Sequence, residues 1–140
     1  MILGIGIDIV EISRVRDGLE KLQDAFVNKV LSPEEIELIP TNVQKKYEFI
    51  AGRWAVKEAI AKALGSGFSS NLPPRDIAVV NDQYGCPQVL RAGGMEMQKV
   101  IRVSISHEKN YAVAMCTVEE LIWYTIKYFS YFLQKNLYFI

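Results

Sequence analysis

The sequence predicts an α+β domain in which an antiparallel-rich sheet packs against one long helix and several shorter helices. Three observations support this class: an alternating apolar segment over residues 2–10, helical apolar spacing between residues 13 and 64, and a return to alternating segments after residue 75. Because strands and helices do not alternate regularly along the chain, a repeated βαβ arrangement is not expected. The length of 140 residues fits a single domain with its own core.

The first predicted strand, residues 2–10, has two contrasting faces. The large apolar residues at positions 3, 5, 7 and 9 are expected to share the buried face, and Gly4, Gly6 and Asp8 the opposite face. Glycines on one face of a strand mark the close approach of another backbone or of a ligand. Asp8 lies at the end of this bare patch, which is an unusual place for a merely solvated carboxylate.

Helical spacing begins at Ser13, a candidate N-cap, and one apolar stripe continues from Val15 to Val30. We therefore expect a single helix over this segment. The sequence SPEE at 32–35 combines a capping box with proline at the first helical position, which predicts a second, short helix that ends at Pro40.

The longest predicted helix covers about residues 42–64 and begins at a second capping box, TNVQ at 41–44. One position of its apolar stripe is occupied by a charged residue, Glu58, which lies about 40° from Trp54 around the helix axis. A carboxylate on a buried helix face costs free energy unless it is paired or bound to a metal. A salt bridge, for example to Lys62 one turn later, is the alternative to a metal site.

After the long helix, a loop at 65–74 leads into a β meander. Four strands are expected, at residues 76–80, 88–91, 101–105 and 111–118. The residues NDQYGCP at 81–87 form the turn between the first two strands, and HEKN at 107–110 joins the last two as a hairpin.

Composition excludes several classes of partner. Sixteen basic and sixteen acidic residues cancel, so no global attraction to nucleic acid is expected. Cys86 and Cys116 belong to no metal-binding or CxxC pattern. The first residues carry no basic segment or cleavage site, so a reducing, cytoplasmic compartment fits best.

The predicted domain at residues 1–120 is followed by a different segment at 121–140. Eight of the 15 aromatic residues lie in these 20 positions, but Lys127 and Lys135 interrupt the apolar runs, so no membrane span is predicted. A packing helix or oligomer contact, a membrane-surface helix, and a tail foreign to the native domain are the alternatives.

Four blocks carry a family resemblance: GIGIDIVEISR (4–14), AGRWAVKEAIAKALGSG (51–67), NDQYGCP (81–87) and VSISHEKNYAVA (103–114). Together they resemble the holo-acyl-carrier-protein synthases, the small bacterial type of 4'-phosphopantetheinyl transferase, over about residues 1–118. The resemblance implies Mg²⁺-dependent transfer of phosphopantetheine from coenzyme A to a serine of apo acyl carrier protein. The other product is 3',5'-ADP, and the reaction supports fatty acid biosynthesis.

The resemblance also implies roles for single residues. Asp8 and Glu58 match the family's Mg²⁺ ligands and, with Lys62 beside the phosphates, form the catalytic group. A metal-bound water or one of the carboxylates would take the serine proton. The residues implied in coenzyme A binding are Arg53, Lys62, Gly65, Ser66, Gly67, Asp82, Gly85, Pro87, Ser106 and His107.

Arg14 and Arg16 fall where the family docks its acidic carrier protein, and a basic helix end suits that partner. Family members are homotrimers with coenzyme A between neighbouring protomers, so two protomers would complete each site. The sequence departs from the family pattern at Ile7, where threonine is more usual, and in its aromatic tail.

Two other functions are the alternatives, and the first of them would use the same metal chemistry. A hydrolase of phosphoanhydrides would consume coenzyme A without an acceptor. A non-catalytic module would only bind coenzyme A or the carrier, and the intact Asp8, Glu58 and Lys62 argue against it.

Overall fold

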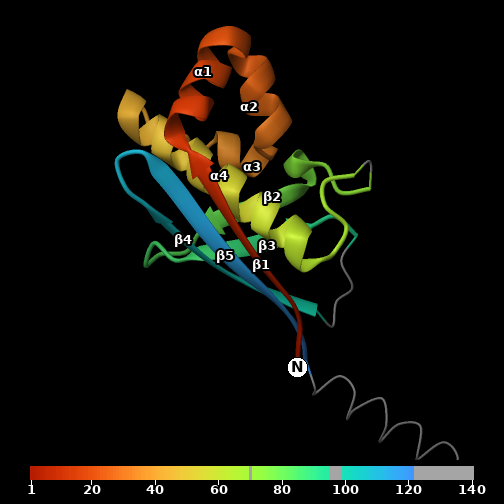
Figure 1. Ribbon diagram of the computed structural model, residues 1–140. Helices are drawn as coiled ribbons and strands as arrows, with labels where there is room; N and C mark the ends of the chain where they lie inside the picture. Colours follow the sequence, from red (N-terminus) through yellow and green to blue (C-terminus); the bar gives the residue numbers. More distant parts are fainter. Residues whose placement is uncertain (70, 95–98, 122–140) are drawn as a thin grey trace, which may run out of the picture.

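The computed structural model describes residues 1–69, 71–94 and 99–121. These residues form an α+β domain, as predicted (Figure 1). The elements in chain order are β1 Ile2–Glu11, α1 Ile12–Leu22, α2 Asp24–Val30, α3 Pro33–Ile36, α4 Val43–Ala63, η1 Pro74–Asp76, β2 Ile77–Asn81, β3 Pro87–Ala92, β4 Lys99–His107 and β5 Tyr111–Glu120. The expected roles of the tail from residue 122 onward lie outside the described residues.

The strands form two sheets, not the single meander that the sequence predicts. β1, β5 and β4 make a three-stranded antiparallel sheet in that order, and β2 and β3 pair as a separate hairpin. The helix α4 lies across the three-stranded sheet and contacts all of its strands. The first strand of the chain therefore pairs with the last, and the predicted hairpin of β4 and β5 is confirmed.

The glycines of β1 face α4, because only a strand without side chains can lie this close to a helix backbone. A Cβ atom added to Gly4 would lie 2.0 Å from the carbonyl oxygen of Ala63, and one added to Gly6 would lie 1.9 Å from that of Ala59. The predicted buried face of β1 is consequently wrong. The isoleucines point away from the helix and are exposed: Ile5 65%, Ile7 61% and Ile9 61%.

The helical segment between β1 and α3 is broken, whereas the sequence predicts one helix. α1 ends at Leu22, Gln23 has a φ of 47°, and α2 begins at Asp24. The break lets both short helices turn apolar residues toward the core, among them Val15, Phe26 and Val30. Ser13 is not the N-cap, because β1 runs directly into α1 and Glu11 occupies the cap position without a side-chain hydrogen bond.

The caps of the next two helices follow the sequence more closely. The capping box of α3 is present: the Glu35 amide donates to Ser32 Oγ at 3.4 Å and the Ser32 amide donates to the Glu35 carboxylate at 2.8 Å. α4 agrees with the predicted span, but its N-cap is Asn42, whose Oδ1 accepts a 3.0 Å hydrogen bond from the Lys45 amide.

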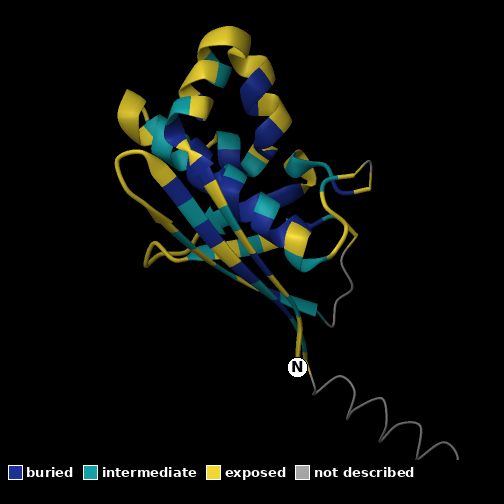
Figure 2. Cartoon of the chain, viewed as in Figure 1, coloured by how far each residue is buried: buried dark blue, intermediate teal, exposed yellow. Residues whose placement is uncertain are grey.

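α4 is buried around most of its circumference, not along one stripe (Figure 2). The sheet covers one side, and α1, α2 and η1 contact others. Buried residues therefore include Arg53 and Lys57, which lie outside the predicted apolar stripe. Within the described residues, every helix is too short or too polar to cross a bilayer.

Candidate active site

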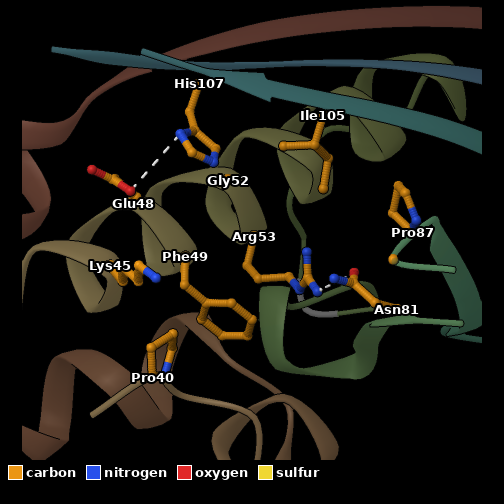
Figure 3. Close-up of a pocket in the computed structure, with 11 residues that line it drawn as sticks. Pro40, Lys45, Glu48, Phe49, Gly52, Arg53, Asn81, Pro87, Ile105 and His107 are labelled. Carbon is orange, nitrogen blue, oxygen red and sulfur yellow. Dashed lines mark hydrogen bonds and ion pairs between the residues drawn. The ribbon is translucent and has the colours of Figure 1, made fainter. Parts of the chain in front are cut away.

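A cleft of about 370 Å³ lies beside the N-terminal half of α4 (Figure 3). It is bounded by α4, the turn between β2 and β3, the end of β4 and the loop before α4. Four residues predicted to bind coenzyme A line it: Arg53, Gly85, Pro87 and His107. The structure thus gathers residues that are up to 54 positions apart in the sequence.

Arg53 projects from α4 into the interior of this cleft. Its Nη2 donates a 2.9 Å hydrogen bond to Asn81 Oδ1, and its guanidinium carbon lies 4.6 Å from the centre of the Phe49 ring, a cation–π distance. The side chain is only 5% exposed, and its buried Nε has no hydrogen-bond partner in the described part of the chain. Burial lowers the pKa of Arg53, although the charge of Glu35 opposes this.

His107 ends β4 at the opposite wall of the cleft. Its Nδ1 lies 3.9 Å from Glu48 Oε2, a distance at which only a protonated histidine would form an ion pair. Lys45 lines the same cleft. With Arg53, these residues bring three basic side chains together, so the cleft is suited to an anion.

Three further residues line the cleft that were not predicted from the sequence: Lys45, Phe49 and Asn81. A signal was available for two of them, because Lys45 and Phe49 precede Arg53 by eight and four positions and so share its helix face. Asn81 begins the NDQYGCP block, but its side chain acts on Arg53 rather than on the turn.

Asp82 shapes the turn that forms one edge of the cleft. Its Oδ1 accepts hydrogen bonds from the amides of Tyr84 at 2.8 Å and Cys86 at 2.9 Å. Gly85 adopts a φ of 84°, which favours glycine. Asp82 is therefore engaged within the turn and places Gly85 and Pro87 against the cleft.

A second cluster joins Asp8, Glu58 and Lys62 between β1 and α4. Lys62 Nζ donates to Asp8 Oδ1 at 2.7 Å and to the Ile7 carbonyl oxygen at 3.0 Å. The ion pair of Lys62 is thus with Asp8, whereas the salt-bridge alternative to a metal site would pair Lys62 with Glu58. The close approach of β1 at Gly6 explains why a strand carboxylate and two residues of α4 meet here.

The electrostatics of Glu58 reflect this crowding. Burial raises the pKa of Glu58, and the negative charge of Asp8 raises it further. A hydrogen bond from the Trp54 side chain and the positive charges of Lys62 and Arg14 act in the opposite direction. A cation between the two carboxylates would relieve their repulsion.

The two carboxylates of this cluster fit Mg²⁺ if other ligands complete its coordination. Mg²⁺ takes one or two protein carboxylates and fills its remaining positions with water and phosphate oxygens. Asp8 and Glu58 supply two carboxylates from different elements. Among the described residues, no group of three or more acidic, histidine or cysteine side chains could form a metal cage. The residues therefore fit a metal that is shared with a phosphate-bearing ligand.

The two predicted carrier-binding arginines lie in different surroundings. The guanidinium carbon of Arg14 is 5.7 Å from the centre of the Trp54 ring, beside the Asp8–Glu58 cluster. Arg16 faces a separate hollow of about 160 Å³ and forms an exposed 3.8 Å ion pair with Asp17. Only Arg14 adjoins the acidic cluster.

The loop after α4 and Ser106 are not brought into the cleft. The amides of Gly65 and Gly67 donate to the carbonyl oxygens of Lys62 and Ala61, at 3.0 and 3.2 Å, and so cap the helix. Ser66 Oγ donates to the Gly67 carbonyl at 3.1 Å. Ser106 is exposed next to His107 on β4. Their contacts with coenzyme A stay predictions.

Known proteins are similar to this chain in sequence and in fold. A sequence model of the 4'-phosphopantetheinyl transferase superfamily matches residues 4–116. The holo-[acyl-carrier-protein] synthase of Anoxybacillus flavithermus is 43% identical over 122 residues, which cover 86% of this chain and 98% of that protein.

Solved structures agree with the sequence relatives. A holo-(acyl-carrier-protein) synthase from Bacillus anthracis in complex with CoA (3',5'-ADP) has a TM-score of 0.77 at 36% identity, covering 86% of this chain and 99% of that one. The Neisseria meningitidis synthase has a TM-score of 0.76 at 30% identity, with 86% and 100% covered. Because the matches span most of this chain and nearly all of each relative, the chain belongs to the 4'-phosphopantetheinyl transferase superfamily.

Proposed function

We propose that the protein is a holo-[acyl-carrier-protein] synthase, which transfers 4'-phosphopantetheine from coenzyme A to a serine of apo acyl carrier protein and releases 3',5'-ADP. The observation that carries the proposal is the Asp8–Glu58–Lys62 cluster, in a chain whose relatives are synthases of this name. The reaction would supply holo carrier protein for fatty acid biosynthesis.

The two groups of residues suit two parts of coenzyme A. The basic cleft with Arg53 and His107 suits the 3'-phosphate end, and Gly85 and Pro87 would lie near the adenine. Asp8 and Glu58 would hold Mg²⁺, which when bound withdraws charge from the diphosphate. Lys62, 52% exposed, would leave its ion pair with Asp8 in part to bind a phosphate oxygen.

The carrier protein would approach over Arg14. This arginine lies at the start of α1 beside the Asp8–Glu58 cluster, so an acidic partner that it attracts would present its serine near the diphosphate. Arg16 would add positive charge at the edge of the same helix.

The cysteines are compatible with a cytoplasmic enzyme. Cys86 is exposed, and it forms no disulfide with Cys116.

A homotrimer is supported by the outer face of the three-stranded sheet. Exposed apolar side chains gather on its β1 and β5 strands: Ile5, Ile7, Ile9, Tyr111 and Met115. An exposed apolar face of this kind marks an interaction surface. Arg53 and Glu58 also lie about 140° apart around α4, so one ligand would reach both more readily with a neighbouring protomer completing the site.

The experiment is incubation with coenzyme A, Mg²⁺ and an apo acyl carrier protein, followed by mass spectrometry of the carrier. We expect the carrier to gain one phosphopantetheine group and 3',5'-ADP to appear in equal amount. Consumption of coenzyme A without carrier modification would identify a hydrolase instead. Binding of coenzyme A without its consumption would identify a binding module. Omission of divalent metal tests the Mg²⁺ requirement separately.

A further inference from the structure

Three charged side chains meet at the floor of the cleft. Glu35 of α3 and Lys57 of α4 are completely buried, and Arg53, one turn before Lys57, is 5% exposed. The group contains two cations and one anion. Buried charges require partners, so it matters which cation neutralises Glu35.

The hydrogen bonds assign Glu35 to Lys57. Lys57 Nζ donates to Glu35 Oε2 and also to the carbonyl oxygens of Val30, at 2.7 Å, and Pro74, at 3.0 Å, which uses all three of its protons. The other oxygen of Glu35 accepts a 3.1 Å hydrogen bond from the Val79 amide.

Arg53 is the cation that makes no hydrogen bond to Glu35. Its Nε lies 3.8 Å from Glu35 Oε1, which is a long ion-pair distance but too far for a hydrogen bond, and this Nε has no hydrogen-bond partner among the described residues. Its Nη2 is bonded only to the neutral side chain of Asn81, at 2.9 Å. Arg53 is also the one member of the three that lines the cleft. The group therefore leaves one positive charge at the cleft floor.

We propose that Lys57 is a positioning residue for ligand binding: by neutralising Glu35, it keeps the Arg53 guanidinium available to a phosphate group in the cleft. The inference rests on the proposed function, because that function places the 3'-phosphate of coenzyme A in this cleft. Without Lys57, the buried Glu35 carboxylate would have Arg53 as its nearest cation, and the long 3.8 Å ion pair would shorten to a hydrogen-bonded one that draws the guanidinium away from the cleft.

The experiment measures binding of 3',5'-ADP and 5'-AMP by isothermal titration calorimetry, because these nucleotides differ in the 3'-phosphate alone. The variants are Lys57→Met, the double variant Glu35→Gln/Lys57→Met, and Arg53→Met as a positive control. The wild type should bind 3',5'-ADP at least about tenfold more tightly than 5'-AMP, as expected for a charge-assisted phosphate contact. Arg53→Met and Lys57→Met should each lose about tenfold of this preference.

The double variant separates charge compensation from a general structural role. It removes the carboxylate together with its cation, so Arg53 stays available and the preference for 3',5'-ADP should stay within about threefold of the wild type. Affinity for 5'-AMP is the internal measure of cleft integrity in every variant.

Each result has one meaning. A wild type without preference for 3',5'-ADP contradicts the ligand assignment of the proposed function. A wild-type preference that Lys57→Met retains in full overturns the role of Lys57, as does a double variant that loses the preference. If Lys57→Met does not fold by circular dichroism, Glu35→Gln and the double variant decide: both should keep the preference, and a tenfold loss in either folded protein overturns the inference.

Discussion

At Gly6, the backbones of β1 and α4 lie in direct contact, and this contact places Asp8 beside Glu58. A Cβ atom at this position would lie 1.9 Å from the Ala59 carbonyl oxygen, so the strand or the helix would have to move. We expect Gly6→Ala to lower the free energy of unfolding by about 2–3 kcal/mol, measured by urea denaturation.

Gly94→Ala is the control, because a Cβ atom there would have no atom of another described residue within 4 Å. It should change stability by less than about 0.5 kcal/mol. Equal effects of the two substitutions would show that the contact at Gly6 is not tight.

Glu58 is expected to be necessary for turnover and unfavourable for folding. We expect Glu58→Gln to lower the transfer rate by about 100-fold or more, because it removes one of two proposed metal-binding charges. The exposed Glu20→Gln is the control. Transfer near the wild-type rate would make Glu58 a structural carboxylate.

We also expect the difference in stability between Glu58→Gln and the wild type to depend on pH in metal-free protein. Burial raises the pKa of Glu58 in the folded state, so the folded protein holds this proton more tightly than the unfolded chain. The resulting stabilisation is complete below the ordinary pKa of glutamate and is lost as the pH rises through the raised value. Glu58→Gln should therefore have a higher Tm than the wild type at pH 7, with a smaller difference near pH 4. A difference that does not change with pH would contradict this origin.

At the residue scale, the sequence could indicate which carboxylates were costly but not all of their partners. Asp8 lies on the glycine face of the first strand and Glu58 in the apolar stripe of the long helix, so each carboxylate interrupts the expected apolar pattern. Lys57 and Glu35 interrupt no such pattern, because each lies at a position where a charged residue is common in a helix with one solvated face. Their burial depends on η1 and β2 packing against α4 and α3.

At the scale of elements, Gln23 carries the strain of the break between α1 and α2. Its φ of 47° is unusual for a residue with a side chain. We expect Gln23→Gly to raise the free energy of unfolding by about 1 kcal/mol, since relief of the strained backbone exceeds the extra entropy of glycine in the unfolded chain.

Lys21→Gly provides the comparison for Gln23→Gly. Lys21 lies inside α1, where glycine should lower stability by about 1 kcal/mol. Thermal denaturation of both proteins is the measurement. A loss of stability in Gln23→Gly would mean that the break is not strained.

Local signals explain why some elements were predicted well. The α3 capping box, the span of α4 and the turn between β4 and β5 depend on residues close together in the chain. The division at Gln23 was missed because the apolar period continues across it. The outward face of β1 was misjudged because alternation identifies two faces but does not say which one meets a helix.

At the scale of the whole molecule, the fold class followed from the order of the elements, but the partition into two sheets did not. That partition depends on β1 pairing with β5, a contact between the two ends of the domain. The division of the chain into a domain at 1–120 and a tail at 121–140 stays a prediction, because residues from 122 onward lie outside the described residues. The trimer also stays a prediction, because the structure contains one chain.

The outer sheet face provides the test of the trimer. Ile7 is 61% exposed on this face, so Ile7→Glu would place a charge in the proposed interface. We expect the variant to sediment as a monomer where the wild type sediments as a trimer. Leu90→Glu, at a 59% exposed site on β3, should leave the trimer intact. A wild type that is monomeric at micromolar concentration would refute the interface.

The pairing of β1 with β5 also has a consequence for synthesis of the protein. Ile2 is opposite Glu119, and the amine of Met1 donates to the Glu120 carbonyl oxygen at 3.0 Å. β1 therefore leaves the ribosome before β5, and it has no partner strand until β5 emerges. At about 5–20 residues per second, the backbone hydrogen-bonding groups of β1 stay unpaired for several seconds or longer. Nascent chains are most open to aggregation during this interval, and a chaperone that binds β1 would act then.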